Sequence, residues 1–257
     1  MKVAVHGMLG GAGDWRGLLP AEDDWRCPEL WRWWRERGDL SPAGEGGEGV
    51  GAEVGGEAPG SAFEQWAEWL DGQAGQGDVL VGYSLGGRLA LHAWLRNPGR
   101  WRQVWIVSAH PGLEDEAERW RRREADAGWA ARLETEAPEG WLASWDAQGV
   151  LAGGLAPEVG QARMERLIAW RVEMARAMRG WSLGRQRPLW DDIVECAGAD
   201  AGVLHWVTGE RDAKFCGLAR QLQRRLPGLQ WHLVEGAGHR VPWEQPRRWL
   251  ALLERYL

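Results

Sequence analysis

The sequence has few cysteines, and their positions exclude the usual cysteine-based devices. Cys27, Cys196 and Cys216 are scattered over 257 residues, and none of them forms a CxxC pair. We therefore expect neither a disulfide framework nor a zinc site. We expect the cysteines to be free thiols in a reducing compartment. Residues 2–5 already resemble a strand, which leaves no room for a signal peptide. No apolar run approaches the roughly 18 residues of a membrane span, so we expect no membrane-spanning helix. We expect the protein to be cytoplasmic.

An excess of positive charge is also lacking. The net charge is -6, which argues against a nucleic acid or an anionic membrane as partner. The aromatic residues are 21 Trp against two Tyr and two Phe, and Lys2 and Lys214 are the only lysines. We interpret the tryptophans as core aromatics, each needing an acceptor for its indole N–H. A stacking surface for nucleic acid is the less favoured alternative.

The order of the apolar runs predicts an α/β fold in a single large domain. Runs with strand character alternate with helical patterns, which favours a mostly parallel, doubly wound sheet. The strand candidates are residues 2–5, 79–83, 104–107, 203–207 and 229–234, with a weaker one at 25–30. A capping box at Ser61 and Glu64 predicts the start of a helix.

Residues 113–193 break this alternation, because they show helical periodicity, many charges and no strand candidate. We predict that they form a helical lid inserted into a core made of residues 1–112 and 194–257. Helical insertions above the carboxyl edge of a sheet commonly cover the site. Residues 44–60, rich in Gly and Glu, are predicted to form a surface loop.

The segment Gly82-Tyr83-Ser84-Leu85-Gly86 lies between a strand candidate and a helix candidate. This context turns a common Gly-x-Ser-x-Gly pattern into a predicted nucleophile elbow, with the Ser84 hydroxyl above the sheet edge. The alternative is a glycine-rich turn that contains an ordinary serine.

Two more residues follow predicted strands, Asp212 and His239. The carboxyl ends of parallel strands lie along one edge, and the order Ser…Asp…His is that of an α/β-hydrolase triad. Histidine can take the proton of a serine hydroxyl, and a carboxylate orients the imidazole. Three alternatives stay open: Asp212 caps the next helix, Glu210 is the acidic member, or His239 is structural.

The backbone amides of Met8 and Leu85 are the predicted oxyanion donors, since they follow the first strand and the serine. His6, in the same loop as Met8, is predicted to organise that loop.

Four motifs together resemble the 2-succinyl-6-hydroxy-2,4-cyclohexadiene-1-carboxylate synthase family, MenH. They are GYSLGGR at 82–88, HPGL at 110–113, SLGRQ at 182–186 and GERDAKF at 209–215. The resemblance extends from residue 6 to about residue 239. It implies an α/β-hydrolase fold and a lyase that eliminates pyruvate from 2-succinyl-5-enolpyruvyl-6-hydroxy-3-cyclohexene-1-carboxylate in menaquinone or phylloquinone biosynthesis. Ser84, Asp212 and His239 then form the triad that supplies the base, with no metal and no organic cofactor.

The same resemblance implies substrate-binding roles for Arg88, Arg122, Tyr83 and Trp145, and by a weaker match for Arg171. The implied ligand is a tricarboxylate, and a guanidinium holds a carboxylate through two charge-assisted hydrogen bonds. The alternative for the run Arg119 to Arg123 is a solvated helix face without a ligand. We expect a monomer or a weak homo-oligomer.

Two other functions fit the residues. The elbow and triad suit a carboxylesterase or a carbon–carbon bond hydrolase equally well, because fold does not fix function. A non-catalytic binding protein on the same fold is the third hypothesis, and a large distance between His239 and Ser84 would favour it.

Overall fold

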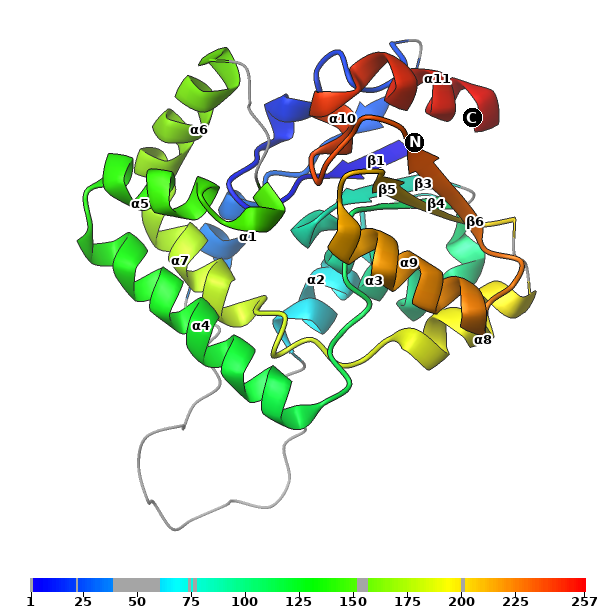
Figure 1. Cartoon of the computed structure of the whole chain (residues 1–257), viewed down its shortest axis with the longest axis horizontal. Coiled ribbons are helices and arrows are strands. Elements are labelled where there is room, and N and C mark those ends of the chain that lie inside the picture. Colours follow the sequence, from blue (N-terminus) through cyan, green and yellow to red (C-terminus); the bar gives the residue numbers. More distant parts are fainter. Residues whose placement is uncertain are drawn as a thin grey trace.

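A six-stranded sheet forms the centre of the computed structural model, which describes residues 2–21, 23–38, 61–73, 75, 78–151, 157–199 and 202–257 (Figure 1). The strand order is β2-β1-β3-β4-β5-β6, and every neighbouring pair is parallel. The strands are β1 (Lys2–Val5), β2 (Trp25–Arg26), β3 (Asp78–Tyr83), β4 (Trp101–Val107), β5 (Leu204–Gly209) and β6 (Gln230–Val234). The predicted parallel α/β sheet is therefore confirmed. The predicted loop at 44–60 lies outside the described residues.

The sheet is buried on both faces because successive side chains of a strand point to opposite sides. Val104 and Ile106 of β4 pack into one apolar cluster, and Trp105 and Val107 pack into the other. The first cluster lies under α1 (Leu30–Arg37), α2 (Ala62–Asp71), α3 (Leu85–Arg96), α8 (Trp190–Ala199) and α9 (Ala213–Arg225). The second lies under α10 (Val241–Glu244) and α11 (Pro246–Tyr256), on the opposite side of the sheet in Figure 1.

The predicted capping box starts α2. The Ser61 amide donates to Glu64 Oε2 at 2.8 Å, and the Glu64 amide donates to Ser61 Oγ at 3.3 Å. Phe63, Trp66 and Leu70 then fall on one helical face and are fully buried. Capping and apolar spacing together fix where α2 begins and which face it buries.

The tryptophans fill the core as predicted, but their indole N–H groups do not all find acceptors. Trp31 donates to the carbonyl of Gly10, and Trp249 donates to that of Leu18. Within the described residues, the buried indole nitrogens without a partner are those of Trp15, Trp25, Trp33, Trp34, Trp66, Trp101 and Trp206. Several of these rings meet edge to face, as Trp33 does with Trp34 and with Trp66. An aromatic face is a weak acceptor, so ring packing replaces part of the predicted hydrogen bonding.

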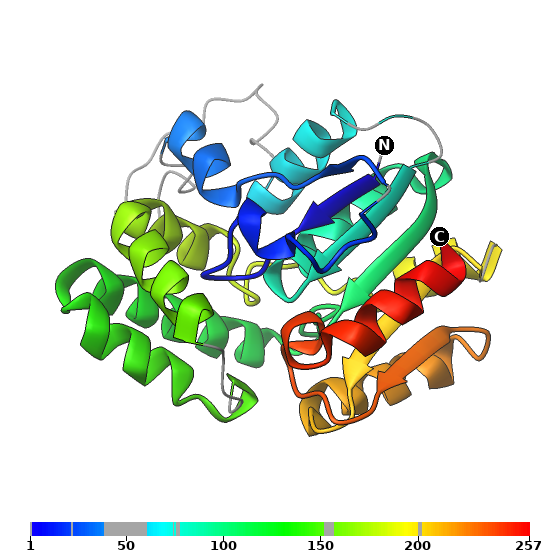
Figure 2. The same ribbon diagram turned by 90° about the horizontal axis from the view of Figure 1, so that it is seen from above.

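Of the α-helices that the structure describes between β4 and β5, the first four are α4 (Glu116–Thr135), α5 (Pro138–Asp146), α6 (Pro157–Ala169) and α7 (Arg171–Gly180). We call them the helical insertion. Figure 2 shows them together on one side of the sheet, away from both termini. The next helix, α8, begins at Trp190, four residues before the predicted restart of the core, and contacts α3. None of the helices that the structure describes combines the length and apolar character of a bilayer crossing.

Candidate active site

Ser84 lies at a sharp turn between β3 and α3, with φ of 54°. This left-handed conformation is unusual for a residue with a side chain and persists only where the surroundings fix it. The Ser84 amide donates to the carbonyl of Val107 at 2.9 Å, which ties the turn to β4. A Cβ at Gly86 would overlap the backbone of Val5, and one at Gly82 would overlap Gly86. The glycines let α3 approach the sheet, and the turn holds the serine above the sheet edge.

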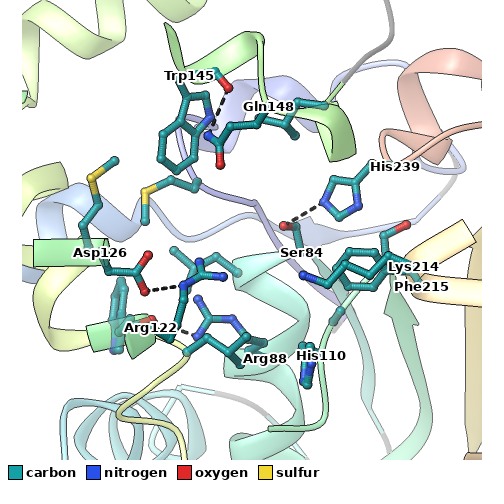
Figure 3. Close-up of a pocket in the computed structure, with 18 residues that line it drawn as sticks. Ser84, Arg88, His110, Arg122, Asp126, Trp145, Gln148, Lys214, Phe215 and His239 are labelled. Carbon is teal, nitrogen blue, oxygen red and sulfur yellow. Dashed lines mark hydrogen bonds and ion pairs between the residues drawn. The ribbon is translucent and has the colours of Figure 1, made fainter. Parts of the chain in front are cut away.

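The three predicted triad residues lie within hydrogen-bonding distance. His239 Nε2 lies 3.2 Å from Ser84 Oγ, and His239 Nδ1 lies 2.9 Å from Asp212 Oδ2 (Figure 3 shows the first contact). Asp212 and His239 are each 6% exposed. This arrangement is what a serine activated by an imidazole requires, and it removes the geometric ground for a non-catalytic binding protein.

Asp212 also serves as the N-cap of α9, since its Oδ1 accepts from the Phe215 amide at 3.2 Å. Its two oxygens therefore satisfy the cap and the histidine at once, so the two interpretations of Asp212 are compatible. The competing carboxylate, Glu210, accepts instead from the Gly236 amide at 2.9 Å. The geometry favours Asp212 as the partner of the imidazole.

Met8 and Leu85 both line a cavity beside Ser84. Leu85 is the first residue of α3, where backbone N–H groups have no partner inside the helix. Met8 follows β1 in a tight turn closed by the Gly10 amide, which donates to the Gly7 carbonyl at 3.0 Å. The buried ring of His6 holds this loop, with Nδ1 2.9 Å from the Gly7 carbonyl. Both residues thus lie beside the serine, as the prediction that their amides serve as oxyanion donors requires.

The cavity beside Ser84 has a volume of about 190 Å³, and most of the charged residues in its wall are cationic. Arg88, Arg122 and Lys214 line it, and Asp126 is the carboxylate in the wall among the described residues (Figure 3). An anion entering this cavity meets more positive than negative charge, which favours a substrate with several carboxylates.

Arg88, on α3, is held by hydrogen bonds to the segment that follows α7. Its Nη1 donates to the Trp181 carbonyl at 2.8 Å and lies 3.4 Å from Gln186 Oε1. Burial, and then the nearby Arg122, lower the pKa of Arg88 to about 9. The guanidinium is charged at neutral pH yet poorly solvated, so a bound carboxylate would stabilise it.

Arg122 is positioned by a buried network of the helical insertion. Its Nε donates to Asp126 Oδ2 at 2.8 Å, and the Ser182 hydroxyl donates to the same oxygen at 2.7 Å. Asp126 is 7% exposed, and its pairing with Arg122 is an i,i+4 contact on α4. The Arg122 Nη atoms make no hydrogen bond to the described residues, which leaves them for a ligand.

The structure does not bring Arg171 to this cavity. Its guanidinium donates to the backbone carbonyls of Leu133 and Glu136 at the end of α4. Carbonyls at a helix C-terminus lack partners inside the helix, and this arginine supplies them. The prediction that Arg171 contacts the substrate rested on the weaker match and is wrong for this structure. Arg171 instead joins α7 to the end of α4 by hydrogen bonds.

Trp145 lines this cavity, whereas Tyr83 lines a smaller one on another side of Ser84. The sequence interpretation missed Lys214 and Asp126. Lys214 belongs to the GERDAKF motif, two residues after Asp212, and burial together with Arg122 lowers its pKa. Its place in that motif was the sequence signal that could have identified Lys214 as a site residue. No group of three or more His, Cys, Asp or Glu is arranged as metal ligands within the described ranges.

Known proteins share both the sequence and the fold. The model of the alpha/beta hydrolase family matches residues 3–252. The 2-succinyl-6-hydroxy-2,4-cyclohexadiene-1-carboxylate synthase of Klebsiella pneumoniae is 33% identical over 183 residues, 69% of this chain and 67% of that protein. The Escherichia coli O1:K1 enzyme of the same name is 31% identical, with the same coverage of both chains.

Solved structures show the same fold. MenH from S. aureus superposes with a TM-score of 0.76 at 22% identity, covering 100% of this chain and 93% of that one. A thermophilic esterase from Thermogutta terrifontis gives 0.67 at 21% identity, covering 99% and 88%. The chain therefore belongs to the alpha/beta hydrolase family and, within it, to the family of the 2-succinyl-6-hydroxy-2,4-cyclohexadiene-1-carboxylate synthases.

Proposed function

We propose that this protein eliminates pyruvate from 2-succinyl-5-enolpyruvyl-6-hydroxy-3-cyclohexene-1-carboxylate, giving 2-succinyl-6-hydroxy-2,4-cyclohexadiene-1-carboxylate in menaquinone or phylloquinone biosynthesis. The names of the relatives support the product. The observation that carries the proposal is the cationic wall of Arg88, Arg122 and Lys214 beside a serine in contact with His239. A substrate with three carboxylates matches that wall better than a neutral ester does.

The triad serves as the base in this mechanism. His239 takes the Ser84 proton, Asp212 stabilises the imidazolium, and the serine oxygen removes a proton from the ring. The electron pair of the broken C–H bond at ring carbon C2 forms a double bond between C2 and C3. The existing C3–C4 π pair moves to C4–C5, and the C5–O bond to the enolpyruvyl group breaks. The enolpyruvate takes up a proton at its methylene carbon and becomes pyruvate, so no water is consumed.

The guanidinium groups stabilise the charge that develops as the proton leaves. Arg88 and Arg122 hold the carboxylates of the ring and of the succinyl arm, and the amides of Met8 and Leu85 serve any oxyanion near Ser84. We further propose that residues 113–193 act as a lid over the sheet edge, because Arg122 and Trp145 of the helical insertion line the cavity. A lid that excludes water strengthens these charge interactions.

A coupled assay of pyruvate release from the authentic substrate tests this function. We expect rapid release by the wild-type protein and a loss of at least about 10³-fold in kcat with Ser84→Ala. Retained substrate binding by Ser84→Ala would show that only the base is missing. Failure of the folded wild-type protein to release pyruvate would rule the lyase out.

An ester or carbon–carbon bond hydrolase is the second candidate, favoured by the elbow with two amides beside Ser84. Such an enzyme would form an acyl intermediate and would not need a cationic wall. Vigorous turnover of short acyl esters that is insensitive to Arg122→Ala would favour it. The lyase predicts weak ester turnover.

A further inference from the structure

The loop of residues 6–11, which we call the β1 loop, packs directly against the nucleophile elbow. Met8 lines the cavity beside Ser84. A Cβ at Gly7 would lie 3.3 Å from the Cβ of Ser84 and 2.8 Å from the ring of Tyr83. The Met8 amide, the proposed oxyanion donor, therefore belongs to a segment in contact with the serine. Its direction depends on how that segment is held.

The backbone next to Met8 is strained. Leu9 has φ of 61°, a left-handed conformation that is uncommon for a residue of this size and persists where contacts fix it. On the core side, the Gly10 amide donates to the Gly7 carbonyl at 3.0 Å, and the Trp31 indole donates to the Gly10 carbonyl at 2.7 Å. Neither of these bonds involves the carbonyl of Leu9.

Arg166 of α6 donates to that carbonyl. Its Nη1 lies 2.9 Å from the Leu9 oxygen, and its Nη2 donates to Asp14 Oδ1 at 2.6 Å. Asp14 Oδ2 lies 3.2 Å from the same Nη1 and accepts from the Gly11 amide at 3.0 Å. One guanidinium thus bridges a carbonyl of the β1 loop and the carboxylate that ends it, an arrangement that suits the planar fork of arginine.

This bridge is largely shielded from water. The side chains of Arg166 and Asp14 are 13% and 17% exposed. A Cβ at Gly11 would overlap the Arg166 guanidinium, so the arginine packs directly on the backbone of the β1 loop. Hydrogen bonds to charged groups are stronger where water is partly excluded. Because Arg166 belongs to the helical insertion and Leu9 to the core, the shape of the β1 loop depends on a residue of the insertion.

We propose that Arg166 is a positioning residue of the active site, whose bridge to Leu9 and Asp14 keeps the Met8 amide directed at Ser84. Arg166 lines neither of the two cavities beside the serine, so it acts through the β1 loop and not on the substrate. The inference rests on the proposed oxyanion role of Met8 and is independent of the elimination itself.

A fluorophosphonate probe tests this role without the natural substrate. The Ser84 oxygen attacks phosphorus, His239 takes the hydroxyl proton and fluoride leaves, while the amide donors bind the phosphoryl oxygen. Intact-protein mass spectrometry measures the second-order rate constant of this phosphonylation. We expect a fall of about tenfold or more in Arg166→Gln. Removing an oxyanion donor costs about 10²-fold or more, and a displaced donor keeps part of its effect.

Arg132→Gln is the matched control, because it breaks another two-bond ion pair of the helical insertion. Arg132 donates to both oxygens of Glu136, at 2.6 and 3.0 Å, at the end of α4. Its rate constant should stay within about twofold of the wild type. Equal slowing in Arg166→Gln and Arg132→Gln would mean that Arg166 only stabilises the insertion, and would overturn the positioning role.

The pH profile of phosphonylation separates a displaced loop from a damaged triad. In Arg166→Gln the plateau should fall, while the midpoint of the rise with pH, which reports ionisation of the triad, should not move. A shifted midpoint would place the defect in the triad and overturn the proposal.

Arg166→Lys keeps the proposal falsifiable should the Gln variant unfold. Lysine retains the positive charge beside Asp14 but lacks the planar fork that reaches Leu9 at the same time. We expect phosphonylation to slow about three- to tenfold in this variant. A wild-type rate constant in Arg166→Lys would show that the bridge is not needed.

The positioning role and the elimination fail separately. Pyruvate release by the wild-type protein, with phosphonylation insensitive to Arg166, would overturn the positioning role and leave the elimination intact. Phosphonylation that depends on Arg166, without pyruvate release, would overturn the elimination and keep the positioning role. Where both hold, Arg166→Gln should lower kcat for pyruvate release about tenfold with KM within about twofold. A change in KM alone would contradict action through the β1 loop.

Discussion

The sheet edge and the helical insertion contribute to the site in different ways. At the sheet edge, Ser84, Asp212 and His239 follow strands and are fixed by backbone hydrogen bonds and close packing. On the insertion, Arg122 is fixed by side chains alone, through Asp126 and Ser182. The comparison teaches that the core carries Ser84 and two of the cations in the cavity wall, Arg88 and Lys214, while the insertion adds Arg122 with its paired carboxylate Asp126.

Replacing the triad carboxylate should produce the largest effect. In Asp212→Asn, one side-chain oxygen can still cap α9, but the histidine loses its charged partner and its tautomer. We expect kcat to fall about 10³- to 10⁴-fold with little change in thermal stability. Glu210→Gln, at the same turn, is the matched control and should stay within about twofold. Equal losses in the two variants would contradict the assignment of Asp212.

Changing the insertion should alter binding more than chemistry. Arg122→Ala removes a guanidinium from the cavity wall, so we expect kcat/KM to fall about 10²-fold, mostly through KM. Arg121→Ala, its exposed neighbour, whose contact with Asp115 is 4.0 Å long, is the control. A loss confined to kcat would show that Arg122 acts in the chemical step, which would contradict the separate roles of the sheet edge and the insertion.

The pH dependence should separate the buried arginine from the triad. Because the pKa of Arg88 is lowered to about 9, raising the pH through 9 removes its charge and with it a carboxylate partner. We expect kcat/KM to decline about tenfold between pH 8 and 10, as one lost proton per site requires. Bound substrate raises the pKa again, so kcat should decline only at higher pH.

The pKa of Lys214 is also lowered, by burial and then by the nearby Arg122, so this lysine is a second candidate for the decline. The profile is therefore measured in Lys214→Gln as well. If kcat/KM still declines between pH 8 and 10 in Lys214→Gln but not in Arg88→Gln, the decline belongs to Arg88. The opposite pattern would reject the prediction.

The smallest effect is expected from Ser182→Ala. The variant removes the hydroxyl that donates to Asp126, while the Arg122 contact to the same oxygen remains. We expect KM to rise about threefold and stability to fall by about 1 kcal/mol, with kcat unchanged. Steady-state kinetics and thermal unfolding measure both. A larger loss in kcat than in KM would show that the network reaches the triad.

Local patterns predicted most of the fold. Apolar runs located β3, β4, β5 and β6 to within a few residues, and the capping box located the start of α2. The helix α1 was missed, because its run of Trp31, Trp33 and Trp34 carries no cap signal, and packing against α7 stabilises it.

The candidate site could be predicted only where a motif marked it. Ser84, Asp212 and His239 each follow a strand, so topology alone brings them to one edge. Asp126 has no such signal, because its contact with Ser182 depends on how the helical insertion folds. The same holds for Arg171, whose partners lie on a helix that sequence spacing does not place.

Asp212 links the integrity of one helix to the reactivity of the enzyme. The carboxylate that begins α9 also orients the imidazole of His239. Fraying of the first turn of α9 would release both contacts together. Inactivation on heating should therefore precede global unfolding, and ligands that tighten this turn should protect activity more than they raise the melting temperature.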